Sequence, residues 1–340
     1  MEETIISICK KTFSWFLNNI VLVIFLSIGI FLNYEKLEFE PRVIFFDVGQ
    51  GDAILLVDSS GEKILIDGGG GDYVVYSISE YLHPRDRYID KVILTHPHED
   101  HLSGIIDILE RYRVGEVLYY PACYNSDLYR HFLYLNENIV IIDKDYFFQG
   151  ESFSLKLLYP LEEPLGECVE FPNVNNASIV LKLTSEHGSI LFPGDAEHEV
   201  EDWLMKNYDK EELQAGVLKA GHHCSRTASS QKFLEYIQPS YAICSVGENN
   251  KFGHPHKETT DIFEKLNIKY NLTYKKEDIV AITIIADDRG PVSPCGACRQ
   301  VMHELMPKET KITLANLKGE TLETTTDALL PYGFVLHYDK

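Results

Sequence analysis

The chain has few basic side chains for its length. Among its 340 residues, 31 Lys and Arg stand against 52 Asp and Glu, which gives a formal net charge of −21. So acidic a surface repels phosphate backbones and offers no broad electrostatic footprint for nucleic acid. A phosphate-bearing ligand must therefore meet positive charge at a local site, such as bound metal ions. The length is sufficient for a large core and for more than one folded unit.

Cysteines are also few, and they are scattered. They are Cys9, Cys123, Cys168, Cys224, Cys244, Cys295 and Cys298. Only the last two form a close pair, so the spacing indicates no disulfide framework. A P-loop is missing too, because the glycine run at 68–71 follows an apolar run but no lysine comes after it.

One long uncharged run stands out, at residues 13–32, after a polar tail of residues 1–12. At 1.5 Å per residue, a helix of this length spans about the 30 Å hydrocarbon core of a bilayer. We predict a single transmembrane helix at 13–33. The alternatives are a cleaved signal peptide and a buried helix of a soluble domain. Lys10 and Lys11 precede the run, which favours a single-pass protein with the N-terminus inside and the bulk of the chain extracytoplasmic.

Six residues in the first third of the chain predict a metal site. An apolar run at 91–94 is followed by His96-Pro97-His98-Glu99-Asp100-His101. Pro97 and the charged residues end the predicted strand and start a loop. Imidazole and carboxylate groups are the usual ligands of zinc and similar divalent ions. His96 and His98 can face one ion, and Asp100 and His101 a second. The alternative is a solvated polar loop.

This hexapeptide resembles the signature of the metallo-β-lactamase superfamily. Further motifs resemble the hydrolase domain of the ComEC family of DNA-uptake membrane proteins, in the same order along the chain. They lie at 46–53, 63–69, 175–178, 193–197, 218–225 and 253–256. Cys224 stands where that family usually has glycine. The resemblance spans about residues 42–282, which we take as the hydrolase domain.

The expected fold is an α/β protein, with an αββα sandwich of two sheets flanked by helices. Apolar runs at 43–46, 53–57 and 63–66 predict strands, and those at 73–82 and 102–111 predict helices. Alternating strands and helices over this length fit such a sandwich.

The resemblance implies the remaining ligands. Asp195 would bridge two ions, and Asp67 would orient the site from behind. His96, His98 and one of His222 or His223 would hold the first ion. Asp100, His101 and His254 would hold the second, although His254 can instead be a proton donor. We expect two Zn²⁺ ions, with Mn²⁺ as the alternative.

The expected chemistry is hydrolysis by a metal-activated hydroxide. Asp100 or Asp195 would orient the hydroxide, and His254 or His223 would protonate the leaving group. The predicted substrate is a phosphodiester, either single-stranded DNA or a cell-envelope polymer, and a channel or envelope protein is a possible partner. A metal-binding interaction module without turnover is a further reading.

The segment 283–340 carries a second resemblance. Residues 284–302 and 329–334 are similar to the second half of small zinc-dependent cytidine deaminases. There Cys295 and Cys298 would supply two thiolates of a second zinc site, which needs four ligands. The third ligand and the catalytic Glu come from a first half that has no counterpart here. We expect a partial α/β deaminase-like piece, an inert remnant. The alternative function is a cytidine deaminase completed by a partner. The cysteine pair can also form a disulfide, a redox pair or a site shared with another chain.

Overall fold

The computed structural model describes residues 39–82, 86–135, 138–164, 166–274, 281–286, 293, 299, 311–316, 318 and 320–330. The predicted transmembrane helix and the pair Cys295 and Cys298 lie outside these residues. Within the described ranges, no helix is long and apolar enough to cross a membrane. The chain divides into two compact units, Met1–Tyr274 and Lys275–Lys340.

The first sheet of the larger unit is built from the first part of the chain. Its strands, in spatial order, are β1 (Arg42–Phe45), β2 (Ile54–Val57), β3 (Lys63–Ile66), β4 (Tyr88–Leu94), β5 (Arg113–Tyr119) and β6 (Ile139–Ile141). The pairs β1–β2 and β2–β3 are antiparallel, and the pairs from β3 to β6 are parallel. The first three predicted strands are confirmed within one residue.

The second sheet follows in the chain and is also mixed. Its strands, in spatial order, are β13 (Lys269–Leu272), β12 (Tyr241–Cys244), β11 (Val217–Lys219), β10 (Gly188–Phe192), β9 (Val180–Ser185), β8 (Phe153–Tyr159) and β7 (Phe147–Gln149). The pairs from β7 to β10 are antiparallel, and those from β10 to β13 are parallel.

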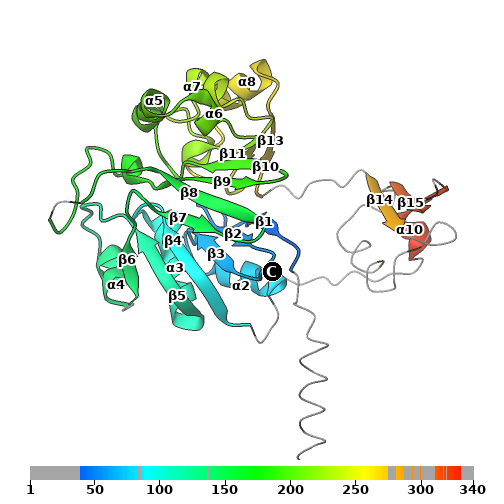
Figure 1. Cartoon of the computed structure of the whole chain (residues 1–340), viewed down its shortest axis with the longest axis horizontal. Coiled ribbons are helices and arrows are strands. Elements are labelled where there is room, and N and C mark those ends of the chain that lie inside the picture. Colours follow the sequence, from blue (N-terminus) through cyan, green and yellow to red (C-terminus); the bar gives the residue numbers. More distant parts are fainter. Residues whose placement is uncertain are drawn as a thin grey trace, which may run out of the picture. The chain divides into compact units, whose positions relative to one another are not determined.

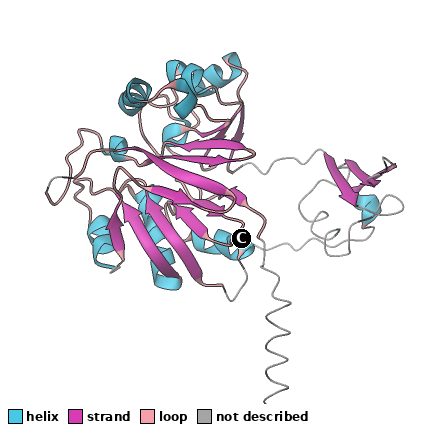
Figure 2. Cartoon of the chain, in the orientation of Figure 1, coloured by secondary structure: helices cyan, strands magenta, loops and turns pink. Residues whose placement is uncertain are grey.

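Each sheet lies between two apolar layers, because successive side chains of a strand point to opposite faces. Figures 1 and 2 show the two sheets with helices on their outer faces. On β2, Ile54 and Leu56 join the core between the sheets, whereas Leu55 packs on the other face. On β9, Leu181 and Leu183 face the same inner core. The outer face of the first sheet is covered by α2 (Tyr73–Tyr81), α3 (Glu99–Arg111) and α4 (Asp127–Leu135). That of the second sheet is covered by α5 (His198–Asn207), α6 (Lys210–Leu213), α7 (Gln231–Ile237) and α8 (Lys257–Lys265). The predicted sandwich of two sheets flanked by helices is confirmed.

Helix α3 begins three residues before the start that its apolar spacing predicts. His98 is the N-cap residue, and Glu99 and Asp100 lie in the first turn. Carboxylates are favourable there because the helix dipole places partial positive charge at the N-terminus. Asp100 and His101 are therefore held on a helix rather than in a loop.

Two disulfides lie in the larger unit, although the spacing of the cysteines indicated no framework. Cys123 pairs with Cys168, 45 residues later, and Cys224 pairs with Cys244, 20 residues later. The first joins the segment after β5 to the segment after β8. The second joins the turn after β11 to the end of β12. Neither pairing is legible in the spacing, because the fold alone brings each pair together.

The smaller unit contains a short sheet in its described residues. Strand β14 (Ala281–Ala286) pairs in parallel with β15 (Lys311–Asn316), which pairs antiparallel with β16 (Thr321–Thr325). Helix α10 (Thr326–Leu329) follows β16. The buried side chains of β15 include Ile312 and Leu314.

Candidate metal centre

The side chains of the predicted site follow strand ends at one edge of the sandwich. The hexapeptide follows β4, and Asp195 comes three residues after β10. His222 and His223 follow β11. Because β3, β4, β10, β11 and β12 run parallel to neighbours within their sheets, their carboxyl ends meet at shared edges, where α/β proteins commonly bind ligands. The fold thus gathers residues that are more than 100 positions apart in the chain.

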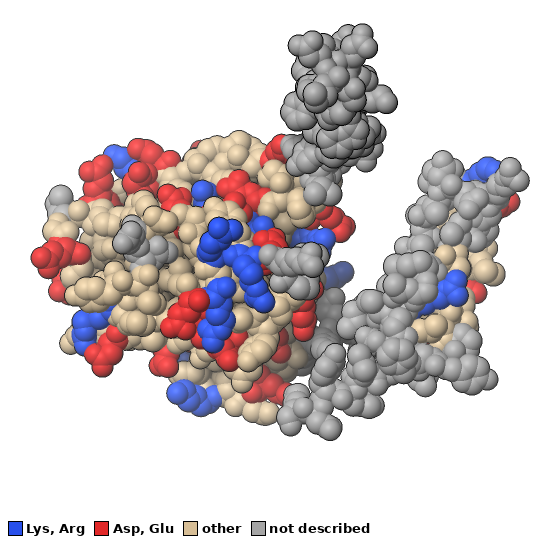
Figure 3. Space-filling model, turned by 90° about the horizontal axis from the view of Figure 1, so that it is seen from below, with Lys and Arg blue, Asp and Glu red and all other residues tan. Residues whose placement is uncertain are grey.

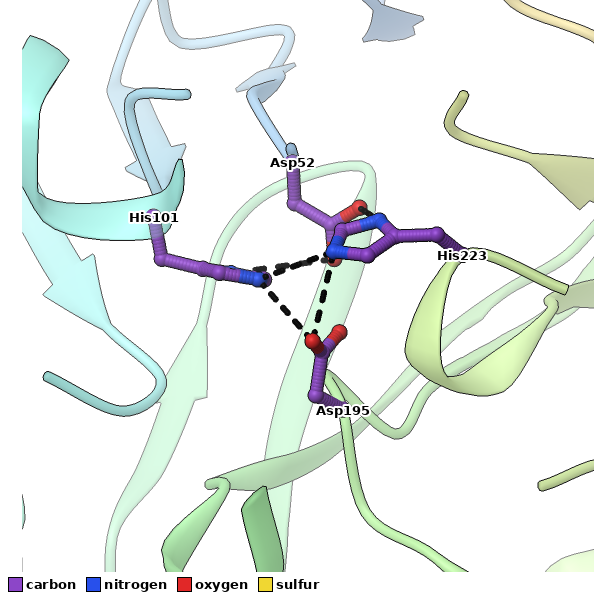
Figure 4. A group of neighbouring side chains, drawn as sticks. All are labelled: Asp52, His101, Asp195 and His223. Carbon is purple, nitrogen blue, oxygen red and sulfur yellow. Dashed lines mark hydrogen bonds and ion pairs between the residues drawn. The ribbon is translucent and has the colours of Figure 1, made fainter. Parts of the chain in front are cut away.

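One half of the centre consists of Asp100, His101, Asp195 and His223. His101 Nε2 lies 3.3 Å from His223 Nε2 and 3.3 Å from Asp195 Oδ2. His223 Nε2 lies 3.2 Å from Asp195 Oδ2 and 3.3 Å from Asp100 Oδ2. Figure 4 shows His101, His223 and Asp195 converging from separate elements. Four ligands at about 2.0–2.1 Å from a tetrahedral zinc ion lie about 3.3 Å apart, so these spacings fit one ion.

The other half consists of His96, His98 and His222. His96 Nε2 lies 3.0 Å from His98 Nδ1. The Nε2 atoms of His96 and His222 each lie 3.9 Å from Asp195 Oδ2. That oxygen therefore faces both halves. His223 lies on the His101 side of Asp195, and His222 Nε2 is as far from Asp195 Oδ2 as His96 Nε2 is.

A sharp backbone turn sends the adjacent histidines to opposite sides. His222, His223 and Cys224 have φ values of 44°, 52° and 59°, in the left-handed region that L-residues rarely adopt. The turn belongs to a 3₁₀ segment at Gly221–Cys224. Cys224 thus occupies a conformation that suits glycine, the residue that the ComEC family usually has there, and its disulfide to Cys244 ties the turn to β12.

Asp67 lies behind His101, as the sequence predicts. Asp67 is fully buried, and its Oδ2 lies 2.7 Å from His101 Nδ1. The same carboxylate accepts hydrogen bonds from Thr95 N at 2.8 Å and Thr95 Oγ1 at 2.6 Å. A carboxylate bonded to the outer nitrogen fixes the ring and leaves Nε2 facing the centre.

The pair Asp52 and Lys219 was not singled out chemically from the sequence, although both lie in family-like motifs. Lys219 is fully buried and forms a short ion pair with Asp52. Its Nζ also donates to Gly194 O at 3.0 Å and lies 3.5 Å from Asp195 Oδ1. Asp52 Oδ1 lies 3.4 Å from His223 Nδ1, the outer nitrogen of that ring. The apolar strand before Lys219 was the available signal, because it predicts burial of the lysine.

His254 lies at the rim rather than among the converging atoms. Its Nδ1 lies 3.3 Å from Gln50 Nε2, and its ring centroid lies 5.7 Å from that of His222. Phe252, 52% exposed, stacks on the His254 ring with centroids 5.9 Å apart. Burial and the nearby His223 lower the pKa of His254 to about 4, so its imidazole is neutral at pH 7.

The centre divides into groups with opposite pKa shifts. Burial opposes charge on His101 and His223, but Asp195 and its neighbours hold the pKa of each imidazole well above its usual value. Burial likewise opposes ionisation of Asp195, yet His223, His101 and Lys219 hold its pKa well below the usual value. Burial lowers the pKa of His96 and His98. In the metal-free chain, the raised pKa values favour protonated rings at His101 and His223, and metal binding there would release those protons.

The donor set fits divalent ions. The centre offers imidazole nitrogens and carboxylate oxygens, which suit zinc and similar ions. Asp52, His101, Asp195 and His223 each offer an atom within 4.8 Å of the others. Several buried oxygens in and around the site have no hydrogen-bond partner, namely those of Gln50 (Oε1), Asp52 (Oδ1), Asn175 (Oδ1) and Asp195 (Oδ1). Buried acceptors without donors are costly, and cations nearby would relieve that cost.

A sandwich of two mixed sheets with a buried Asp/His cluster at its strand ends defines a metal-dependent hydrolase of the metallo-β-lactamase fold. The chain belongs to the metallo-β-lactamase superfamily, whose family model matches residues 46–248.

Two bacterial proteins match more than 60% of the chain. ComE operon protein 3 of Bacillus subtilis is 27% identical over 256 residues, which cover 69% of this chain and 32% of that protein. Recombination protein 2 of Haemophilus influenzae is 31% identical over 219 residues, covering 63% of this chain and 25% of that protein. The chain thus spans about a third or less of the length of these relatives.

A separate short segment matches another family. Cytidine deaminase of Halalkalibacterium halodurans is 54% identical over 59 residues, which cover 17% of this chain and 45% of that enzyme. The resemblances to the ComEC family and to cytidine deaminases are both confirmed.

Proposed function

We propose that the chain is a dinuclear metal phosphodiesterase that acts on single-stranded DNA. The observation that carries this proposal is the position of Asp195, whose Oδ2 faces histidines on both sides at 3.2–3.9 Å. A carboxylate oxygen shared in this way suits a pair of cations, and paired cations are typical of phosphodiester hydrolysis.

We assign two ligand sets that share Asp195. His96, His98 and His222 would hold the first ion, whereas Asp100, His101 and His223 would hold the second. The ions would supply an activated water and neutralise charge on the phosphoryl oxygens. Asp67 keeps His101 oriented, and Thr95 keeps Asp67 in place. His254 is assigned a positioning role at the rim, because its neutral imidazole is a poor proton donor at pH 7.

Phe252 favours a substrate with flat rings. Its exposed ring lies beside His254, whose ring centroid is 6.2 Å from that of His223. Stacking of a base on an aromatic ring contributes about 1–3 kcal/mol and needs no basic surface. On the face shown in Figure 3, basic side chains form one group near the middle and are otherwise scattered among acidic ones. Stacking can therefore provide affinity that the net charge of −21 does not. The Haemophilus relative is named a recombination protein. Recombination is a process of DNA, so this name also supports the substrate.

We further propose that residues 13–33 anchor the protein in a membrane, with the larger unit outside the cytoplasm. Two disulfides within that unit support this side, because disulfides persist in oxidising compartments. A channel or envelope protein remains the proposed partner for delivering the strand.

The test measures metal content and hydrolysis by the purified full chain. We expect two ions per chain and turnover of bis-p-nitrophenyl phosphate and single-stranded DNA. Phe252→Ala should raise KM for DNA about 5- to 150-fold, the equivalent of one lost stacking contact, and leave the metal content unchanged. Phe147→Ala is the control, because Phe147 is similarly exposed but lies on β7, outside the site. Metal-loaded protein that cleaves neither substrate would refute the proposal, and cleavage of an envelope phosphodiester polymer in preference to DNA would refute the substrate.

The second candidate function is cytidine deamination, favoured by the 54% identity of the short C-terminal match. That match covers 45% of the Halalkalibacterium enzyme. We propose that this segment does not deaminate on its own, because Cys295 and Cys298 are two zinc ligands without a matched third ligand or catalytic Glu.

A further inference from the structure

Lys219 is a charged side chain without any exposure, placed at the base of the centre. It ends β11, and its ammonium group has three acceptors around it: Gly194 O, Asp52 Oδ2 and Asp195 Oδ1. Gly194 O and Asp52 Oδ2 are within hydrogen-bond distance of the ammonium group, and Asp195 Oδ1, at 3.5 Å, adds a charge contact. A buried charge persists only with such compensation. The carboxylates of Asp52 and Asp195 compensate the charge of the ammonium group.

The two oxygens of Asp195 face different partners. Oδ2 takes all four contacts with histidine Nε2 atoms, at 3.2–3.9 Å. Oδ1 has no hydrogen bond and faces Lys219 Nζ at 3.5 Å. The backbone of Asp195 is also held in place, because its N–H donates a hydrogen bond to Ser178 Oγ at 3.0 Å. Lys219 thus offsets charge on the oxygen that points away from the histidines.

Asp52 faces the Nδ1 atoms of the histidine rings and not their Nε2 atoms. We therefore do not count it in either ligand set. Its Oδ1 is 3.4 Å from His223 Nδ1, and its Oδ2 is 4.0 Å from His101 Nδ1. Both are the ring nitrogens that point away from the convergence of Nε2 atoms. Asp52 therefore serves as the counter-ion of Lys219, although its oxygens are close enough to the cluster to be mistaken for ligands.

We propose that Lys219, with Asp52 as its counter-ion, is a positioning residue that holds Asp195 so that one oxygen alone bridges the two ligand sets. This inference rests on the dinuclear centre of the proposed function. Without the ammonium group, Asp195 Oδ1 would be free to turn toward one ion. The carboxylate would then chelate that ion instead of linking both through a single atom.

The test uses Mn²⁺ as the probe with the full chain, because two Mn²⁺ ions that share one oxygen show exchange coupling in electron paramagnetic resonance. We expect wild-type protein to bind two Mn²⁺ with a coupled signal. Lys219→Met, which keeps length and removes charge, should lose the coupled signal and weaken the second Mn²⁺ at least tenfold. Lys63→Met is the matched control, because Lys63 is also nearly buried and ion-paired, to Asp86 at 3.0 Å, but lies outside the centre.

A variant with both charges removed keeps the test decisive if Lys219→Met does not fold. Asp52→Asn with Lys219→Met leaves no unpaired buried charge. It should fold and still lose the coupled signal, because nothing holds Asp195 Oδ1. Two Mn²⁺ with unchanged affinity and coupling in either variant would overturn the inference. Metal titration and resonance do not depend on turnover, so a chain that cleaves no phosphodiester would refute the function and leave this result standing.

Discussion

Replacing Asp67 by Asn tests how the centre is supported from behind. The Asp67 carboxylate accepts from three donors, Thr95 N, Thr95 Oγ1 and His101 Nδ1, at 2.6–2.8 Å. An amide has one acceptor oxygen, and its NH₂ group would face a donor. Asp67 has a φ of 58°, a conformation that Asn tolerates, so the substitution adds little backbone strain.

The magnitude follows from these contacts. A buried donor that loses its acceptor costs about 1–3 kcal/mol of folding stability. Loss of the carboxylate behind a ligating imidazole reduces metal affinity about 10- to 100-fold, or about 1.4–2.7 kcal/mol of binding. We therefore expect Asp67→Asn to fold with a lower Tm and to bind metal about 10- to 100-fold more weakly. Thermal unfolding without metal and a metal titration measure the two effects separately.

Asp58→Asn is the control for general destabilisation. Asp58 is fully buried and accepts from five donors on Ser60, Glu151 and Ser152, in turns that lie outside the centre. It should lower Tm comparably and leave metal affinity unchanged. Wild-type metal affinity in Asp67→Asn would refute the reasoning, and so would an equal loss of affinity in Asp58→Asn.

Other expectations concern hydrolysis, acid stability, the membrane and deamination. His98→Ala should abolish hydrolysis and lower metal content from two ions to one, with an unchanged far-UV spectrum; full activity would argue against the ligand set. Hydrogen bonds from Ser152 and Ser60 outweigh burial and hold the pKa of Asp58 well below its usual value. The contribution of Asp58 to folding stability is therefore present above about pH 4 and is lost as the pH falls toward the lowered pKa. In metal-free protein, the Tm difference between wild type and Asp58→Asn should thus shrink from about pH 5 to about pH 3, and a constant difference would contradict this account. Full-length chain should sediment with membranes after cell breakage, and its recovery unprocessed in the supernatant would count against the anchor. The full chain should produce no uridine from cytidine; uridine that disappears in Cys295→Ser would restore the deaminase hypothesis.

Local sequence patterns predicted the strands and drew attention to the ligand candidates that follow them, because both depend on neighbours in the chain. The strand before His96 is an apolar run, and the helix after it shows apolar spacing. By contrast, the different directions of His222 and His223 depend on a turn in the left-handed region. The residue types at these positions do not predict that turn. Cys224 even replaces the glycine that would have signalled it.

Residues that act through distant partners were harder to predict. Lys219 ends a short apolar strand, and its counter-ion Asp52 lies far from it in the chain. The role of a buried lysine can be inferred only when the carboxylates that face it are known. The disulfides were missed for the same reason, since Cys123 follows a strand of the first sheet and Cys168 follows a strand of the second. The transmembrane helix and the zinc pair of the C-terminal segment stay predictions.

Because the two sheets follow one another along the chain, the metal centre takes its residues from both halves of one domain. The first sheet ends at Ile141 and the second begins at Phe147. His96, His98, Asp100 and His101 come from the first half, and Asp195, His222 and His223 come from the second. A chain cut between β6 and β7 would give two fragments, each with an incomplete ligand set. The Cys123–Cys168 disulfide and the apolar core between the sheets would still join the fragments, and each ligand set is complete only when the two halves are together.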